Sequence, residues 1–398
     1  MKRWMILAIM IATAIPGQAQ LDPYLAGRAL MIQGKYDSAL VQLDRALEKE
    51  PGKTEIYMSQ GICCFSLNRI PAAREAFYEV EKRREGMASL YLARIEVRLN
   101  HPELAVKYLK EHLSSKYRIP ENEILLDPDL SRLEGSEAWQ QLWKEQNWYS
   151  ESDKEFQEAL FLKENGDALE AINRLNRLEK ENYNRSSVFE AKADIYKKLG
   201  NNKAAISALN DAVKSDVRNL DALMKLSYFE IENGDLDDAV YALDRVIRQE
   251  PYRFEAYLLR ATARSGTDNL RGALEDLELY LSYFPNSHEV IYQKGIIQYE
   301  HGRYLDAIQS FNKALDMDRG NAAYYFARGR TYASTGTTRY ADKDLSMALD
   351  LDPYNGDIWL EKGKIARKLG DLEGACHCFR MAFQYGIYEA QELLERCK

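Results

Sequence analysis

The chain has 398 residues, of which 46% are hydrophobic and 29% are charged. With only 10 prolines and 22 glycines, its composition is that of a globular protein and argues against wholesale disorder. The formal net charge of −8 argues against a general binder of nucleic acids or of anionic membranes. Beyond the N-terminus, no stretch approaches the roughly 18 apolar residues that a membrane-spanning helix needs.

The N-terminal segment has the three parts of a secretory signal peptide. Lys2 and Arg3 precede an apolar run that ends at Ile15, and Ala19 completes a small-x-small cleavage pattern. We therefore predict a signal peptide over residues 1–19, with cleavage after Ala19. The alternatives are a buried helix or a membrane anchor, for which the apolar run is short. The expected location is the periplasm, the periphery of the outer membrane, or the medium outside the cell.

Glycine, alanine and bulky apolar residues recur in phase along the chain. Glycines return every 34 residues, or after 68 where Asp268 takes the place of one, at Gly166, Gly200, Gly234, Gly302, Gly336 and Gly370. An alanine stands five positions after each glycine, and a leucine or phenylalanine stands four positions after the alanine. This period is the signature of a repeat protein.

Each unit is predicted to contain two helices. In one unit, Tyr325, Gly329 and Tyr332 lie at i, i+4 and i+7, which is one face of a helix. The turn glycine ends that helix, because it enters the left-handed conformation without a Cβ penalty. Ala341 and Leu345 then mark the inner face of a second helix. Small residues are expected where the two helices approach too closely for a larger side chain.

A helix-turn-helix unit of 34 residues with these positions in phase resembles the tetratricopeptide repeat. The resemblance implies an all-α, right-handed superhelix (solenoid) whose first helices line a concave groove. Three repeats form a first block over 20–119, and the third is degenerate because Asn100 and Pro102 replace the usual turn pair. Seven repeats form a second block over 152–389, and residues 390–398 are expected to cap it.

Residues 120–151 break the phase and carry three tryptophans. Trp139 and Trp143 lie one helical turn apart, and Trp148 follows. Because aromatic pairs at this spacing bury a large area, we interpret the segment as a helical interruption that caps the first block or fills the joint between blocks. The alternative is an exposed docking patch.

No motif in the sequence points to a catalytic site. There is no HExxH pattern, no glycine-rich phosphate loop and no GxSxG pattern. The histidines are scattered, with no carboxylate or second histidine at metal-ligand spacing. We therefore expect no enzyme, no metal and no cofactor.

The five cysteines match neither a disulfide framework nor a zinc site, because their number is odd and no CxxC pattern occurs. Cys63 and Cys64 are predicted to be core residues of one helix. Cys397 could pair with either Cys376 or Cys378 if the last helix folds back, and an oxidising compartment would permit either bond.

The family resemblance places the candidate partner-binding residues on the first helices. They are Tyr228, Glu232, Glu255, Glu289, Tyr292, Tyr299, Glu300, Phe326 and Arg330. Among the residues expected to face inward in the second block, nine acids outnumber four bases. Tyrosines among carboxylates suit a basic or amphipathic extended peptide, because rings stack on apolar and guanidinium groups and acids attract bases.

Some members of the family clamp a partner's C-terminal carboxylate with groove lysines and asparagines, and others hold extended peptides with a ladder of asparagines. Neither pattern is present here, because the corresponding row reads Asp194, Tyr228, Thr262, Ile296 and Arg330.

We interpret the chain as a non-enzymatic protein-interaction scaffold of the cell envelope that supports assembly of an envelope or secretion complex. One alternative is a module that binds a glycan or a cell-wall fragment through stacking tyrosines. The other is a structural subunit of a large complex.

Overall fold

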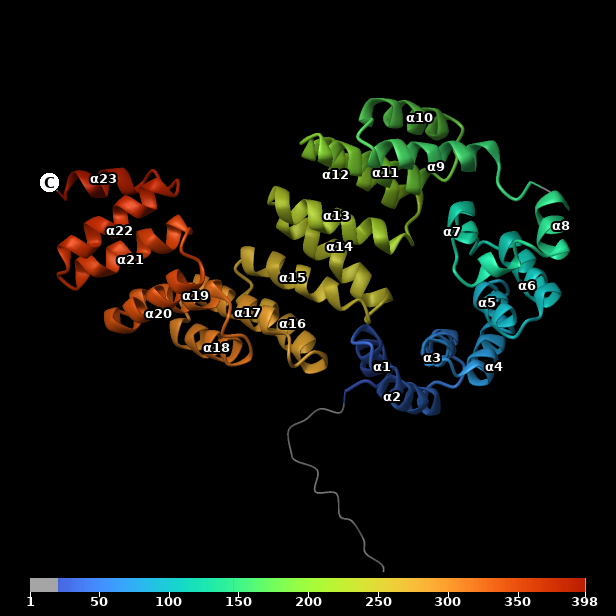
Figure 1. Cartoon of the computed structure of the whole chain (residues 1–398), viewed down its shortest axis with the longest axis horizontal. Helices are drawn as coiled ribbons and strands as arrows, with labels where there is room; N and C mark the ends of the chain where they lie inside the picture. The colour runs from blue at the N-terminus through green and yellow to red at the C-terminus, as the bar shows by residue number, and fades with distance from the viewer. Residues whose placement is uncertain (1–20, 146, 398) are drawn as a thin grey trace, which may run out of the picture. The chain divides into compact units, whose positions relative to one another are not determined.

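The computed structural model describes residues 21–145 and 147–397, so the predicted signal peptide over 1–19 lies outside the described residues. Within these ranges every regular element is a helix (Figure 1). The described residues form two compact units, which divide between Trp148 and Tyr149. In the described ranges, no helix combines the length and the apolar character needed to cross a membrane.

The first unit contains three helix pairs followed by three short helices. They are α1 (Pro23–Ile32), α2 (Tyr36–Lys49), α3 (Thr54–Ser66), α4 (Ile70–Glu81), α5 (Ser89–Arg98), α6 (Pro102–Ser114), α7 (Glu121–Leu125), the 3-10 helix η1 (Leu130–Leu133) and α8 (Glu137–Glu145).

The second unit contains seven helix pairs and a short terminal helix. They are α9 (Glu151–Glu164), α10 (Ala168–Lys180), α11 (Arg185–Lys198), α12 (Asn202–Ser215), α13 (Leu220–Asn233), α14 (Leu236–Gln249), α15 (Phe254–Gly266), α16 (Leu270–Tyr283), α17 (His288–Glu300), α18 (Tyr304–Met317), α19 (Ala322–Ser334), α20 (Thr338–Leu351), α21 (Gly356–Lys368), α22 (Leu372–Gln384) and α23 (Ala390–Glu395). Figure 1 shows this unit as a curved stack, with α13, α15, α17 and α19 on its inner side and α14, α16, α18 and α20 on its outer side.

The turn between the two helices of a repeat has the predicted left-handed backbone. Gly234 and Gly302, for example, have φ values of 87° and 72°. Asp268, which replaces the glycine in one repeat, adopts the same conformation with φ 56°. Aspartate is one of the few residues other than glycine that tolerates this region, so the substitution preserves the turn.

Small residues allow the two helices of a repeat to approach closely, as predicted. A Cβ added to Gly295 on α17 would lie 2.5 Å from Cε1 of Phe311 on α18. The ring of Phe311 is fully buried and cannot move aside. Gly363 stands in the same relation to Phe379, also at 2.5 Å. A glycine on the first helix that faces a phenylalanine on the second helix is therefore a recurring packing feature of these repeats.

Arginines on the first helices form ion pairs with a buried carboxylate of their own repeat, and one of them also reaches the preceding repeat. Arg260 on α15 donates to Asp276 on the following helix at 2.5 Å and to Asp244 on the preceding helix at 2.6 Å. Two repeats later, Arg328 makes a two-pronged contact with Asp344 at 2.7 and 2.8 Å. These ion pairs were not predicted, although the basic residues keep the 34-residue step at Arg260, Lys294, Arg328 and Lys362.

The interruption packs against the first unit. Trp139 and Trp148 are each 6% exposed, and the Trp148 indole N–H donates to the Leu142 carbonyl at 2.9 Å. Arg94 on α5 pairs with Asp127, which precedes η1, at 2.6 Å. Trp139 and Trp148 are therefore packing residues of the first unit.

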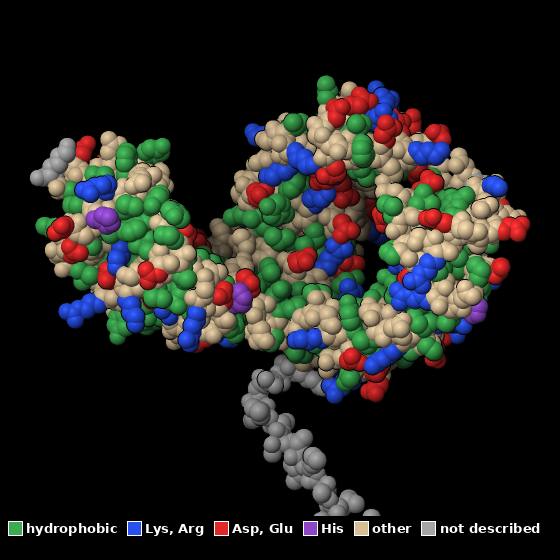
Figure 2. All heavy atoms as spheres, in the orientation of Figure 1, with side chains coloured by type: hydrophobic (Ala, Val, Ile, Leu, Met, Phe, Trp, Pro, Cys, Tyr) green, Lys and Arg blue, Asp and Glu red, His purple; other side chains and the backbone are tan. Residues whose placement is uncertain are grey.

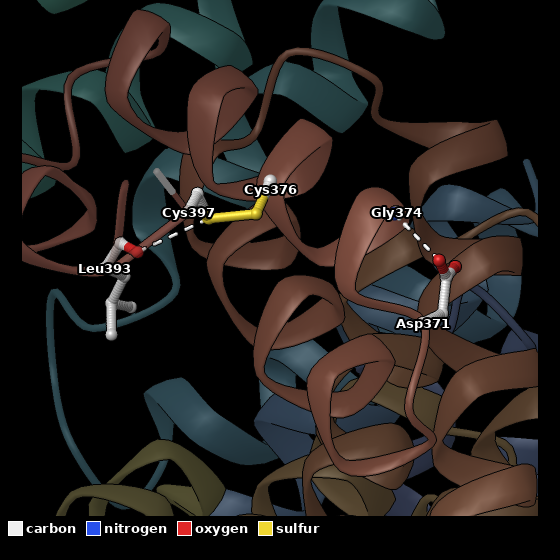
Figure 3. The surroundings of a disulfide bond; sticks show 5 residues. All are labelled: Asp371, Gly374, Cys376, Leu393 and Cys397. Carbon is white, nitrogen blue, oxygen red and sulfur yellow. Dashed lines mark hydrogen bonds between the residues drawn. A yellow bond between two sulfur atoms is a disulfide. The ribbon is translucent and has the colours of Figure 1, made fainter. Parts of the chain in front are cut away.

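A disulfide bond holds the C-terminal helix to the last repeat (Figure 3). Cys397, just after α23, pairs with Cys376 on α22, which decides between the two partners left open by the sequence. Cys378 is a buried free thiol, as are Cys63 and Cys64, which confirms the predicted core position of that pair. The half-buried Leu393 and Leu394 pack on the cluster around Phe379 and Ala382.

Candidate functional site

The nine candidate residues all lie on first helices of the second unit. Tyr228 and Glu232 are on α13, Glu255 is on α15, four residues from Glu289 to Glu300 are on α17, and Phe326 and Arg330 are on α19. These helices face the inner side of the curved stack (Figure 1). Figure 2 shows an open notch in this unit, with hydrophobic and charged side chains along its edges.

Three of the candidates form one cluster, which we call the guanidinium seat: Tyr299, Phe326 and Arg330. The Arg330 guanidinium carbon lies 5.4 Å from the ring centre of Tyr299 and 5.6 Å from that of Phe326. Cation–π contacts of this kind contribute roughly 0.5–1 kcal/mol each at exposed sites. Neighbouring repeats therefore hold this exposed cation between two rings.

Tyr292 has a packing role beside the seat. Its ring lies 5.7 Å from Phe311 and 4.8 Å from Tyr324, centre to centre. Burial raises the pKa of the Tyr292 phenol, and the positive charge of Arg330 opposes part of that rise. Tyr324 in turn hydrogen-bonds Nδ1 of His288 at 2.8 Å. Tyr292 thus lines the inner side and also joins two repeats.

Tyr228 and Glu232 form a separate group on α13. Glu232 pairs with Lys197 of α11, and hydrogen bonds from Lys197 and from the Tyr228 hydroxyl hold the pKa of the Glu232 carboxyl below its usual range. The same hydrogen bond to Glu232 raises the pKa of the Tyr228 phenol. The Tyr228 side chain remains 47% exposed, so its ring is available for stacking.

Many inward acids of the second unit are neutralised within the protein. Asp194 lies 3.1 Å from Lys163 and 3.0 Å from Lys225, on the first helices to either side. Lys198 reaches Glu164 at 3.4 Å. The acidic surplus counted along the sequence therefore overstates the charge offered to a partner, because Lys225 was not counted among the inward bases.

Three candidate acids keep their charge exposed. Glu255, Glu289 and Glu300 are exposed side chains on α15 and α17. In the part of the chain that the structure describes, none of them forms an ion pair with lysine or arginine, and Glu289 lies 3.4 Å from the His288 ring nitrogen Nε2. These three carboxylates therefore place unneutralised negative charge on α15 and α17.

No cluster of three or more histidine, cysteine or carboxylate side chains that could hold a metal ion occurs within residues 21–145 and 147–397. The candidate residues instead provide aromatic faces, carboxylates and a guanidinium on adjacent helices. Such groups contact a partner through stacking and charge, and they are the kinds of residue that concentrate binding energy at protein interfaces.

A family model described as "Tetratricopeptide repeat" matches residues 24–88, 190–254, 258–322 and 292–342, together more than half of the chain. Superkiller complex protein 3 of Homo sapiens is 27% identical over 177 residues, which are 43% of this chain and 11% of that protein. A TPR repeat-containing protein of Methanocaldococcus jannaschii is 25% identical over 205 residues, which are 50% of this chain and 32% of that protein. Each alignment thus spans less than a third of the relative.

The fold is also found in a crystal structure of a tetratricopeptide repeat protein from Parabacteroides merdae. The two structures superpose with a TM-score of 0.52 at 19% sequence identity, covering 62% of this chain and 98% of the other. At this identity the likeness establishes the helical solenoid fold and nothing further.

Proposed function

The chain belongs to the tetratricopeptide repeat family, and from this premise we propose that it is a non-enzymatic scaffold of the cell envelope. Repeats of this family form protein-interaction scaffolds that bind protein partners and are in general non-enzymatic. The proposed partner is a protein, bound through an extended basic or amphipathic segment against α13, α15, α17 and α19.

The observation that carries this proposal is the set of exposed carboxylates beside aromatic rings. Glu289 and Glu300 flank Tyr292 and Tyr299 on one helix, and Glu255 stands on the helix before it. Charges that lack an internal partner attract an external one, and this electrostatic fit mainly sets the association rate and the specificity. The rings supply contact area for the aliphatic parts of the same segment.

The proposed location in the envelope rests on the N-terminal sequence. Its test is the mass of the chain recovered from cells after expression with the N-terminus intact. Cleavage by a signal peptidase after Ala19 predicts a product that begins at Gln20. A full-length product that stays in the cytoplasmic fraction would remove the envelope from the proposal and leave the scaffold role unaffected.

The binding proposal is tested by crosslinked capture from envelopes with the full chain and two charge variants. The groove variant removes three exposed carboxylates: Glu255→Gln, Glu289→Gln and Glu300→Gln. The matched control removes three exposed carboxylates of the second helices: Glu275→Gln, Asp316→Asn and Asp350→Asn. At about 0.5–1 kcal/mol for each exposed pair, the groove variant should recover a partner at least about tenfold less efficiently than wild type.

The control variant should recover the same partner at the wild-type level. Equal loss in both variants would show that net charge alone drives the capture. Titration with cell-wall fragments distinguishes the glycan alternative. Saturable heat that disappears in Tyr228→Ala would replace the protein partner with a sugar.

A further inference from the structure

The guanidinium seat contrasts with several basic positions on the first helices of the second unit. Four first-helix lysines are each held by a carboxylate of the protein: Lys163, Lys197, Lys225 and Lys364. Arg330, by contrast, makes no ion pair within the ranges that the structure describes, and its side chain is exposed. Two aromatic rings, from α17 and α19, take the place of the missing carboxylate.

The exposed Arg330 side chain presents its hydrogen-bond donors to solvent beside two aromatic rings. A guanidinium is planar and carries five N–H donors around its edge. The rings of Tyr299 and Phe326 occupy positions near the guanidinium, and the Tyr299 hydroxyl lies 3.4 Å from Oγ of Ser334 on α19. Such contacts restrict the rotamers of Arg330 in advance, so less entropy is lost when a ligand binds. A carboxylate is the group whose geometry fits this edge with two parallel hydrogen bonds.

The surroundings of the seat indicate what carries that carboxylate. The exposed acids Glu289 and Glu300 lie on the adjacent helix α17, and they oppose a strongly acidic ligand while favouring one with basic groups next to its acid. First helices continue on both sides of Arg330, as α17 and α21, so an extended chain can pass the seat in either direction. These features favour an acid inside a segment over one at its end.

We propose that the guanidinium seat binds the side-chain carboxylate of an aspartate or glutamate within an extended segment of the partner, whose neighbouring residues are basic. This inference rests on the proposed function and adds the one acidic position that the segment must contain. The seat consists of a single arginine and two rings, without the groove lysines and asparagines that are absent from this row of the sequence.

The test is a selection of random linear dodecapeptides, amidated at the C-terminus, on the full chain. Enriched peptides should share one aspartate or glutamate flanked by lysine or arginine. The best peptide is then synthesised with its acid changed to the corresponding amide, and affinities are measured by fluorescence anisotropy. Loss of a two-pronged, charge-assisted pair should weaken binding to wild type about tenfold to a hundredfold.

Three protein variants assign this loss to the seat. In Arg330→Gln the acid-to-amide change in the peptide should have almost no further effect, because the partner of the acid is gone. Arg330→Lys keeps the charge without the planar fork and should restore only part of the affinity. Arg271→Gln, which removes a 92% exposed arginine of α16, is the control and should bind like wild type.

Several outcomes would overturn the inference. Enriched peptides without a common acid would do so, as would wild-type affinity in Arg330→Gln. Peptides that bind only with a free C-terminal carboxylate would reassign the seat to a chain end. If peptides lose affinity in the Glu255, Glu289 and Glu300 variant but not in Arg330→Gln, the proposed function stands and this inference fails. If no peptide is enriched, both fail together.

Discussion

A buried carboxyl on α13 predicts an unusual pH dependence of stability. Glu230 is 5% exposed, and its Oε2 has no hydrogen-bond partner among the described residues. Burial, with the nearby charges of Asp238 and Asp235, raises the pKa of Glu230 from 4.5 to about 7. The folded chain therefore holds this proton at pH values where the unfolded chain has released it.

The sign of the effect follows from this difference in proton binding. A raised carboxyl pKa contributes stability that is fully present below the unfolded pKa of 4.5 and is lost as the pH rises through about 7. At 1.36 kcal/mol for each unit, ionised Glu230 should cost about 3 kcal/mol of unfolding free energy at pH 8 relative to pH 4. Glu230→Gln removes the charge with little change in shape. It should therefore be more stable than wild type at pH 8, by up to about 3 kcal/mol, and similar to wild type at pH 5.

The assay is urea unfolding followed by circular dichroism, on wild type and Glu230→Gln side by side between pH 5 and pH 8. Groups that titrate equally in both proteins cancel in the difference. Asp238→Asn provides a second check, since removal of that neighbouring charge should shift the pH dependence to lower pH. A stability difference that stays constant across the range, or a variant that is less stable at pH 8, would refute the reasoning.

Three further predictions concern the packing of the repeats. Cys376→Ser opens the disulfide across a sequence separation of 21 residues and should lower the unfolding free energy by about 3 kcal/mol, a loss that disappears when both proteins are measured with dithiothreitol. Gly295→Ala meets a buried ring and should cost about 1–3 kcal/mol in urea unfolding, whereas Gly320→Ala, which meets only a side-chain oxygen at 3.4 Å, should cost almost nothing. Arg328→Met leaves the buried carboxylate of Asp344 without its two-pronged partner and should lower the free energy of unfolding by about 3–5 kcal/mol. The double variant Arg328→Met with Asp344→Leu should recover most of that loss. A double variant as unstable as Arg328→Met alone would contradict the ion-pair explanation.

The repeat itself could be predicted from the sequence because its rules are local. A left-handed turn residue and a small residue opposite a phenylalanine act within one helix pair. Asp268 obeys the same local requirement, because the turn needs a left-handed backbone conformation that aspartate can adopt as well as glycine. The packing of Trp139 followed from its spacing and size for the same reason.

The charge pattern of the inner side could not be predicted in the same way, because it depends on pairs that cross repeats. Lys225 and Asp194 are 31 residues apart and lie on different helices. Whether they form an ion pair depends on the direction of each side chain and on the rotation between neighbouring repeats. A count of charged residues along the chain gives no information about either. The disulfide is a similar case, since two candidate cysteines on one helix point in different directions and only Cys376 faces Cys397.

The difference between paired and unpaired charges separates structural from partner-binding positions on the inner side. A carboxylate held by a lysine of the next helix contributes to stacking of the repeats, and a partner must break that pair before using either charge. Asp194 and Glu232 are of this kind. A partner can contact Glu255, Glu300 and Arg330 without breaking such an ion pair. These residues lie on the successive first helices α15, α17 and α19. This stretch is therefore where we expect a mixed-charge segment to bind.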